Sequence, residues 1–209
     1  MSDTRPPISE RGPTVGGIVL AAGRSTRYGP ENKLLTPVSG TAMVERAATT
    51  AVESGLEAVV AVVGHHRKAV SDALSPTVDG VEYNDRYAAG QSASVRHGVA
   101  IARERDWDAV VFMLGDMPFV DPATVDRLRH VYGSTAASIV VPRHEGERGN
   151  PVVFGHRHFG QLANLTGDRG GRELLLAHED TRFVDVADPG VTLDIDTRRD
   201  RAAYLGSRS

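Results

Sequence analysis

Small and cationic residues gather directly after a short apolar run near the start of the sequence. The run is residues 18–22, IVLAA, and it predicts a buried strand. The residues that follow it are Gly23, Arg24, Ser25, Arg27, Gly29 and Lys33. Glycine allows backbone conformations in which amide N–H groups turn toward a ligand, and Arg27 and Lys33 add positive charge. We therefore predict a loop that binds the triphosphate of a nucleotide.

The spacing of these residues differs from two common phosphate-binding motifs. It matches neither G-x-G-x-x-G nor G-x-x-x-x-G-K-[ST], so a dinucleotide fold and a P-loop lose their usual support. Arg24, Arg27 and Lys33 also have a simpler interpretation as solvated loop charges. Their place after a buried strand favours a binding site, because ligands of parallel sheets lie outside the carboxyl ends of the strands.

Three aspartates are candidates for binding a metal ion. Asp116 follows an apolar run that predicts another buried strand, whereas Asp194 and Asp196 flank Ile195 on the last predicted strand and therefore share one face. Each also has a structural interpretation, as a turn residue or as the cap of a helix that begins near Thr197. If Asp116 and Asp196 converge, they form an all-oxygen site suited to Mg²⁺, which is commonly shared with phosphates.

Several other chemistries lack the residues that they need. The chain contains no cysteine, which excludes disulfides, thiolate metal sites and a cysteine nucleophile. His65 and His66 are adjacent and His156 and His158 are two apart, so no H-E-x-x-H zinc motif is present. Gly-x-Ser-x-Gly, the motif of the hydrolase nucleophile, is also absent. The sequence indicates no covalent nucleophile.

Strand-like apolar runs alternate with stretches of helical spacing along the chain. The predicted strands are residues 18–22, 58–63, 81–83, 109–114, 138–141, 152–154, 181–186 and 191–195. The predicted helices cover residues 44–52, 68–74, 95–104, 122–131, 159–165, 173–177 and 197–205. This order predicts one α/β sandwich with a mostly parallel sheet.

Composition limits the other possible roles. The length of 209 residues suits one domain, and residues 1–14 lack the apolar core of a signal peptide, so we expect a disordered N-terminal tail. A formal net charge of −3 gives no reason to expect nucleic-acid binding. No segment is apolar over the roughly 20 residues that span a membrane. We expect a soluble protein without a membrane partner, and the lack of cysteine is compatible with a cytoplasmic location.

Six motifs in the sequence resemble those of a known family. The stretch LAAGRSTRYGPENKLL resembles the L-A-A-G-x-S-x-R-x-G…K signature of the nucleotidyltransferases that act on the molybdenum cofactor, above all the cytidylyltransferase branch. Five further motifs follow in the expected order: NDRYAAGQSASVRHG, LGDMPFV, GNPVVF, GDRGGRELL and DIDTRRD. The resemblance extends from Gly16 to about Asp200. It implies a three-layer α/β/α sandwich with a mostly parallel, Rossmann-like sheet of the nucleotide-diphospho-sugar transferase type, formed by residues 15–209 as a single NTP transferase domain.

The resemblance also implies roles for individual residues. The catalytic residues would be Arg27, Lys33 and Asp116, and the Mg²⁺ ligands would be Asp116 and Asp196, with Asp194 as the alternative to Asp196. The residues implied to bind the nucleotide are Leu20, Ala21, Ala22, Gly23, Arg24, Ser25, Arg27, Lys33, Asn84, Gly90 and Ser94. The residues implied on the acceptor side are Gly149, Asn150, Asp168, Gly170 and Arg172.

The resemblance implies transfer of a nucleoside monophosphate, from CTP as the expected donor, to the terminal phosphate of the molybdenum cofactor with release of pyrophosphate. A molybdoenzyme that receives the product becomes a candidate partner. CTP is expected because the first motif of this chain begins L-A-A-G, with Ala22 in third place. The guanylyltransferase branch resembles L-A-G-G, with glycine in that place. The alternatives are a guanylyltransferase, a sugar-phosphate nucleotidyltransferase, and a nucleotide-binding module without catalysis.

Overall fold

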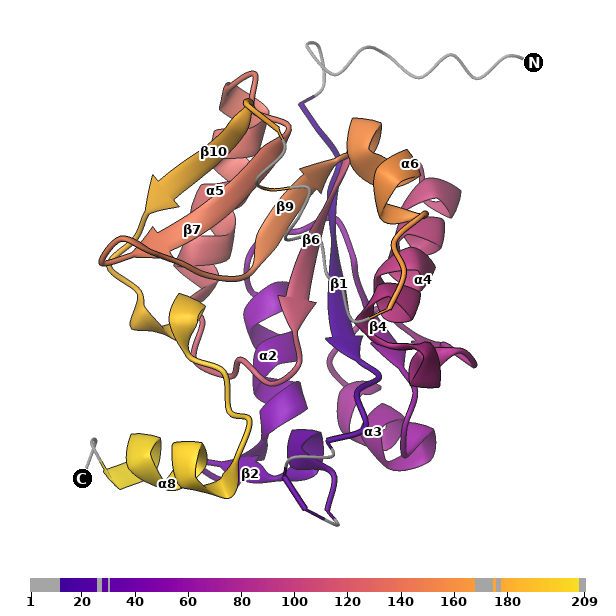
Figure 1. Ribbon diagram of the computed structural model, residues 1–209, viewed down its shortest axis with the longest axis vertical. Coiled ribbons are helices and arrows are strands. Elements are labelled where there is room, and N and C mark those ends of the chain that lie inside the picture. Colours follow the sequence, from indigo (N-terminus) through magenta and orange to yellow (C-terminus); the bar gives the residue numbers. More distant parts are fainter. Residues whose placement is uncertain (1–11, 26–27, 30, 168–174, 176–177, 207–209) are drawn as a thin grey trace.

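The computed structural model describes residues 12–25, 28–29, 31–167, 175 and 178–206. The expected disordered tail therefore lies outside the described residues, except for residues 12–14. Most of the helix expected at residues 173–177 also lies outside them. The two ends of the described chain lie far apart, at the top and the lower left of Figure 1.

A mostly parallel sheet forms the centre of the fold (Figure 1). The strands follow the order β10-β7-β9-β6-β1-β4-β5, with β8 paired to β7. Among the described strands of this sheet, only β8 and β9 run antiparallel to the others, and β9 lies between β6 and β7. The strands are β1 (Val15–Ala21), β4 (Val59–Val63), β5 (Gly80–Tyr83), β6 (Ala109–Leu114), β7 (Ile139–His144), β8 (Glu147–Arg148), β9 (Val152–Gly155) and β10 (Thr181–Asp185). A separate small hairpin pairs β2 (Pro37–Val38) with β3 (Thr41–Ala42).

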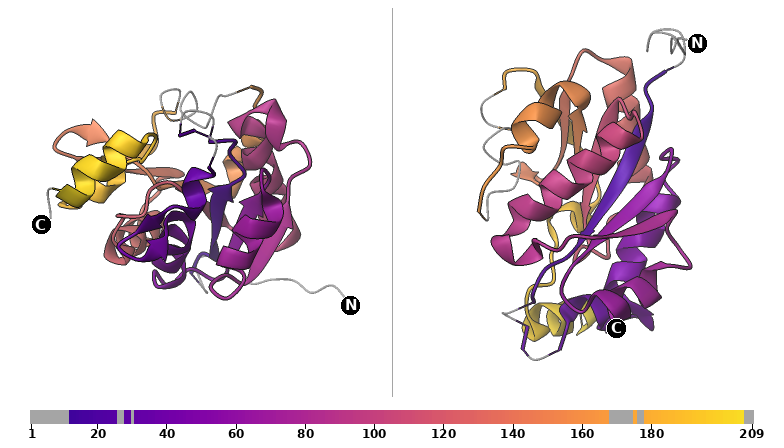
Figure 2. Two further views of the ribbon diagram at one scale, coloured as in Figure 1. Left: turned by 90° about the horizontal axis from the view of Figure 1, so that it is seen from below. Right: turned by 90° about the vertical axis from the view of Figure 1, so that its right-hand side faces the viewer.

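Helices cover both faces of this sheet (Figure 2). One face packs against α2 (Met43–Val52), α3 (Arg67–Leu74) and α5 (Pro122–Ser134), and the other against α4 (Gln91–Glu104) and α6 (Phe159–Leu162). The helix α8 (Arg198–Gly206) lies beside the lower edge of the sheet. Short 3-10 turns complete the fold: η1 (Lys33–Leu35), η2 (Tyr87–Ala89), η3 (His156–His158) and η4 (Pro189–Thr192). The three-layer α/β/α class implied by the resemblance is confirmed.

The alternation of side chains along β1 explains the two cores. Val15 and Val19 point into the core under α2 and α3, whereas Ile18 points into the core under α4. Successive side chains of a strand face opposite sides, so a strand buried on both faces is apolar at every position. The same pattern in β4 and β6 made these strands readable from the sequence.

One predicted strand is wrong. Residues 191–195 do not form a strand: η4 ends at Thr192, and residues 193–196 are irregular. The cause lies just before them, where the Asp188 side chain accepts a hydrogen bond from the Gly190 amide at 2.8 Å and Pro189 occupies the first position of the turn. The argument that Asp194 and Asp196 share one face of a strand therefore loses its basis. In the described part of the chain, no helix is both long and apolar enough to cross a membrane.

Candidate active site

The carboxyl ends of β1, β4 and β6 meet at the lower edge of the sheet in Figure 1. The register pairs Leu20 with Leu114 and Ala21 with Val63. The residues that follow each strand therefore lie next to one another, and the Gly115 amide donates a hydrogen bond to the Leu20 carbonyl at 3.1 Å. This placement brings the end of β1, where the predicted phosphate-binding loop begins, beside Asp116.

Asp116 and Asp196, 80 residues apart in the sequence, converge at this edge. The backbone N–H of Ile195 donates to the carbonyl oxygen of Asp116 at 3.1 Å, which joins the two segments. Lys33 then lies between the two side chains: its Nζ is 2.7 Å from Asp116 Oδ2 and 2.8 Å from Asp196 Oδ1. The Lys33 side chain is only 12% exposed, against 22% for Asp116 and 23% for Asp196. One ammonium group thus bridges two partly covered carboxylates.

The charges of this cluster shift the pKa values of its members. Burial lowers the pKa of Lys33, but the Asp116 and Asp196 carboxylates outweigh burial, so the pKa lies above its ordinary value and the ammonium stays charged. The pKa of Asp194 is raised by burial and then by the negative charges of Asp196 and Asp116. Asp194 is therefore electrostatically part of the same acidic cluster, although the ammonium contacts the other two carboxylates.

The pair of carboxylates fits a divalent cation. One oxygen of Asp116 and one of Asp196 already face a single positive charge, that of the Lys33 ammonium. Carboxylate oxygens are also the ligands that Mg²⁺ prefers. In the described ranges, no group of three or more histidine, aspartate or glutamate side chains has the arrangement of a complete metal cage. A site with few protein ligands suits a metal that is shared with phosphate oxygens and water.

The predicted phosphate loop closes on itself through side chains. Ser25, at φ 53°, donates from Oγ to Asn32 Oδ1 at 3.2 Å and accepts from the Lys33 amide at 3.3 Å. Asn32 Oδ1 also accepts from the Leu34 amide at 3.0 Å and so caps η1. These bonds fix the start of η1, and with it the origin of the Lys33 side chain. Arg27 lies outside the described residues.

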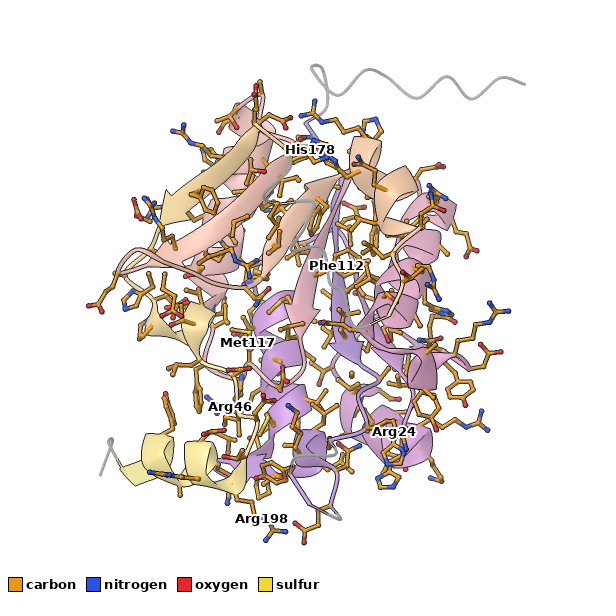
Figure 3. All side chains as sticks on the ribbon, viewed as in Figure 1. Arg24, Arg46, Phe112, Met117, His178 and Arg198 are labelled. Carbon is orange, nitrogen blue, oxygen red and sulfur yellow. The ribbon has the colours of Figure 1, made fainter. Side chains whose placement is uncertain are left out.

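The other residues predicted to bind the nucleotide lie around the same edge. Asn84 is 3% exposed and donates from Nδ2 to Ser94 Oγ at 3.2 Å, and its Oδ1 accepts from the Arg86 amide at 3.0 Å. These contacts hold the loop that leads through Gly90 into α4. Arg24 is exposed (Figure 3). Burial, then the charge of His66 and then that of Arg24 lower the pKa of His65, just before α3, so Arg24 lies close to that histidine.

Ala22 occupies a tightly packed position at the end of β1. It is 4% exposed, and a Cβ placed on Gly64 would lie 2.9 Å from the Ala22 Cβ. Close packing against Gly64, which follows β4, therefore explains why a small residue stands at position 22. A contact with a nucleotide base would explain it equally well.

The predicted acceptor residues are only partly described. Gly149 lies against η4, because a Cβ on it would be 2.3 Å from the Val191 carbonyl oxygen, and the Asn150 amide donates to that oxygen at 2.8 Å. The turn that contains them is thus joined to the segment that leads to Asp194 and Asp196. Asp168, Gly170 and Arg172 lie outside the described residues.

A second group of polar residues lies at the opposite end of β7. Ser138 Oγ is 2.7 Å from His158 Nε2 and donates to Asp180 Oδ2 at 2.6 Å. This is not the arrangement of a catalytic triad, because in a triad the histidine, rather than the serine, contacts the aspartate. His158 and Ser138 are also buried, and burial lowers the pKa of His158. The group is therefore a buried hydrogen-bond network and supplies no activated nucleophile.

Sequence reasoning missed three features of the site. It did not anticipate that Lys33 bridges the two carboxylates, that Asn32 organises the loop, or that Asp200 contacts the backbone of the Asp196 segment. The spacing of Thr197 and Asp200, T-x-x-D before a helix, is a variant of the capping box and was a readable signal for the last of these. Contacts between distant segments, such as Lys33 with Asp196, have no local signal.

Comparisons with known proteins find one matching family and several similar proteins. The model of a family described as the MobA-like NTP transferase domain matches residues 17–181. The purine catabolism protein PucB of Bacillus subtilis (strain 168) is 29% identical over 197 residues, which are 90% of this chain and 94% of PucB. Nicotine blue oxidoreductase of Paenarthrobacter nicotinovorans is 29% identical over 193 residues, which are 88% of this chain and 93% of that protein.

Solved structures are similar over almost the whole chain. Rv0371c from Mycobacterium tuberculosis H37Rv has a TM-score of 0.80 and 32% identity, over 93% of this chain and 98% of that chain. A crystal structure of the same protein in complex with manganese has a TM-score of 0.77 and 33% identity, over 93% of this chain and 99% of that chain.

Proposed function

The chain belongs to the family of MobA-like NTP transferase domains and is a nucleotidyltransferase of that family, and from this premise we propose that it transfers CMP from CTP to the terminal phosphate of the molybdenum cofactor. We take residues 15–209 as one transferase domain. The observation that supports the proposal most directly is the convergence of Lys33, Asp116 and Asp196 at the carboxyl edge of the sheet. A cation and two carboxylates placed together there suit a triphosphate and its metal ion.

The proposed reaction is a displacement at phosphorus. An oxygen of the acceptor's terminal phosphate forms a bond to the α-phosphorus of CTP, and the bond from that phosphorus to the oxygen bridging the β-phosphate breaks. Pyrophosphate leaves with the electron pair of the broken bond. A phosphate monoester has its second pKa near 6, so the nucleophile is already anionic at neutral pH and needs no general base. Catalysis then rests on positioning and on stabilising charge.

The residues of the chain supply these two functions in the proposal. Arg27 and Lys33 hold the triphosphate and stabilise the charge of the leaving pyrophosphate. Lys33 exchanges its carboxylate partners for phosphate oxygens when the nucleotide binds. Asn84, Gly90 and Ser94 lie on the side of the sugar and base, and Gly149 and Asn150 on the side of the acceptor, where Asp168, Gly170 and Arg172 are also assigned.

Asp116 and Asp196 are the residues proposed to hold Mg²⁺. When bound there, the ion would neutralise phosphate charge and polarise the phosphoryl group under attack. The choice of a divalent cation is supported by the manganese complex of the related Rv0371c.

The direct test is incubation of the purified protein with Mg²⁺, purified molybdenum cofactor and each of the four common nucleoside triphosphates in turn. We expect pyrophosphate release with CTP, dependent on the cofactor. Release with GTP but not with CTP would instead identify a guanylyltransferase. A parallel incubation with a sugar phosphate in place of the cofactor tests the sugar-phosphate branch, which release in that mixture alone would identify. Binding of nucleotide without release in any mixture would identify a non-catalytic module.

Lys33→Ala is expected to weaken binding of CTP more than binding of CMP, and binding of CMP more than binding of cytidine. The ammonium interacts with phosphate charge rather than with the base, so its effect grows with the number of phosphates. Calorimetric titration of the three ligands into both proteins measures this series. Equal losses for all three would assign Lys33 to a structural role through Asp116 and Asp196.

The wild-type protein is expected to prefer CTP over GTP, and Ala22→Gly is expected to reduce that preference without inverting it. One methyl group gives about 1–3 kcal/mol of discrimination between two substrates. We therefore expect hydrogen bonds from neighbouring backbone groups to contribute to the preference for CTP as well. The ratio of kcat/KM for CTP and GTP in both proteins measures the effect. A wild-type preference for GTP would contradict the cytidylyl assignment. An unchanged ratio in the variant would show that Ala22 only packs against Gly64.

A further inference from the structure

The start of α8 carries a reciprocal pair of hydrogen bonds. Thr197 Oγ1 accepts from the Asp200 amide at 3.2 Å, and Asp200 Oδ2 accepts from the Thr197 amide at 2.7 Å. This is the geometry of a capping box, in which the residue before a helix and the third helical residue satisfy each other's backbone donors. A capping box alone explains why α8 begins at Arg198.

The Asp200 carboxylate makes one contact more than the cap requires. The same Oδ2 also accepts from the backbone N–H of Asp196 at 3.2 Å. The side chain of Asp196 in turn contacts Lys33 at 2.8 Å. Asp200 therefore fixes the backbone of the residue that directs one of the two carboxylates into the site.

The helix that carries Asp200 is itself anchored. The Arg201 guanidinium donates two hydrogen bonds to the Pro37 carbonyl, from Nε at 2.9 Å and from Nη2 at 2.8 Å. Ile195, just before the cap, is buried in a cluster with Tyr28, Val38 and Met43. The position of Asp200 is therefore set relative to the hairpin of β2 and β3 and to the loop that leads to Lys33. Arg198 of this helix lies beside the same loop (Figure 3), and its Nη2 donates to Glu31 Oε2 at 3.0 Å.

We infer that Asp200 is a positioning residue, which holds Asp196 in the orientation that a divalent cation requires. This inference rests on the proposed metal role of Asp196. Removing a group that orients a metal ligand, without itself binding the metal, commonly lowers metal affinity by about 10–100-fold. Asp200 would act in this way through a backbone amide rather than through the ligand's side chain.

The chain offers a matched pair of variants that separates this role from capping. Thr197→Ala and Asp200→Ala each remove one half of the capping box, but only Asp200→Ala releases the Asp196 amide. Titration with Mn²⁺, with the free ion followed by electron paramagnetic resonance, measures affinity without turnover. We expect Asp200→Ala to weaken Mn²⁺ binding about 10-fold and Thr197→Ala to change it less than about 2-fold, while both lower the melting temperature by similar amounts.

Asp200→Asn then distinguishes the hydrogen bond from the charge, because it keeps an acceptor oxygen and removes the negative charge. We expect its Mn²⁺ affinity to lie closer to that of the wild type than to that of Asp200→Ala. Equal losses in Asp200→Asn and Asp200→Ala would overturn the inference, as would equal losses in Thr197→Ala and Asp200→Ala. A wild-type protein that binds no Mn²⁺ would overturn the proposed metal site, and this inference with it.

Discussion

Asp116→Asn is expected to abolish nucleotidyl transfer while leaving the fold and the melting temperature nearly unchanged. The carboxylate lies at the open edge of the sheet, next to Lys33 and Asp196, and it contributes little to the packed core. The substitution keeps the size of the side chain but removes the charge that the proposed metal requires. We expect kcat to fall by more than about 100-fold. Losses of up to about 100-fold are seen for residues that only hydrogen-bond to a metal ligand, and Asp116 is proposed to be a ligand itself. Pyrophosphate release by the purified variant measures this.

The two remaining aspartates provide the comparison for this result. Asp196→Asn should lose activity as Asp116→Asn does, because the same ammonium contacts both carboxylates. Asp194→Asn should lose much less, although Asp194 lies in the same electrostatic environment. The reverse order would make Asp194 the second ligand. Turnover like that of the wild type in Asp116→Asn would remove the metal assignment altogether.

Gly16→Ala is expected to destabilise the protein by about 3 kcal/mol, the upper end of the usual cost of overpacking a core. A Cβ at this position would lie 2.1–2.2 Å from three carbons of the Trp107 ring. The indole is 4% exposed and packs in the core under α4, with the Arg105 guanidinium 5.8 Å from the ring centroid, so it has little room to move away. For a chain of this size the melting temperature should fall by roughly 6–12 °C.

Gly160→Ala is the control for the Gly16 variant. A Cβ on Gly160 would meet nothing within 4 Å, and the residue lies in α6. We expect its melting temperature to stay the same or rise slightly, because alanine favours a helix over glycine. Thermal unfolding followed by circular dichroism measures both variants. A Gly16→Ala protein as stable as the wild type would mean that Trp107 has an alternative position.

The periodicity of the sequence predicts the centre of the fold well. The strands that became β4, β6 and β9 were expected within about one residue of their observed bounds, because strands buried on both faces are apolar throughout. An aspartate followed by a proline is typical of the start of a helix, and Asp121, which precedes Pro122, does cap α5, since its side chain accepts from the Ala123 amide at 2.8 Å. Local rules that depend on neighbours in the sequence were sufficient for these elements.

The site was predicted less completely, because its geometry depends on distant segments. Residues 191–195 have the composition of a strand, but Asp188 and Pro189 start a 3-10 turn there instead. Asp116 and Asp196 nevertheless converge, because the Ile195 amide donates a hydrogen bond to the Asp116 carbonyl, although Asp196 does not lie on a strand. The roles of Arg27 and of the acceptor residues Asp168, Gly170 and Arg172 stay predictions, since these residues lie outside the described part of the chain.

If Asp116 and Asp196 hold a divalent ion as proposed, the contact of Lys33 with both carboxylates couples binding of the ion to binding of the triphosphate. A cation that arrives alone would have to displace the positive charge that Asp116 and Asp196 already hold, which lowers its affinity without preventing binding. A triphosphate that arrives alone must draw Lys33 away from two carboxylates and leave them repelling each other. When both arrive together, Lys33 would turn to the phosphates, and Asp116 and Asp196 would then be available to hold the ion. By linkage, each ligand would then raise the affinity for the other by the same factor, and the contact of Lys33 with the two carboxylates would be the source of cooperative binding.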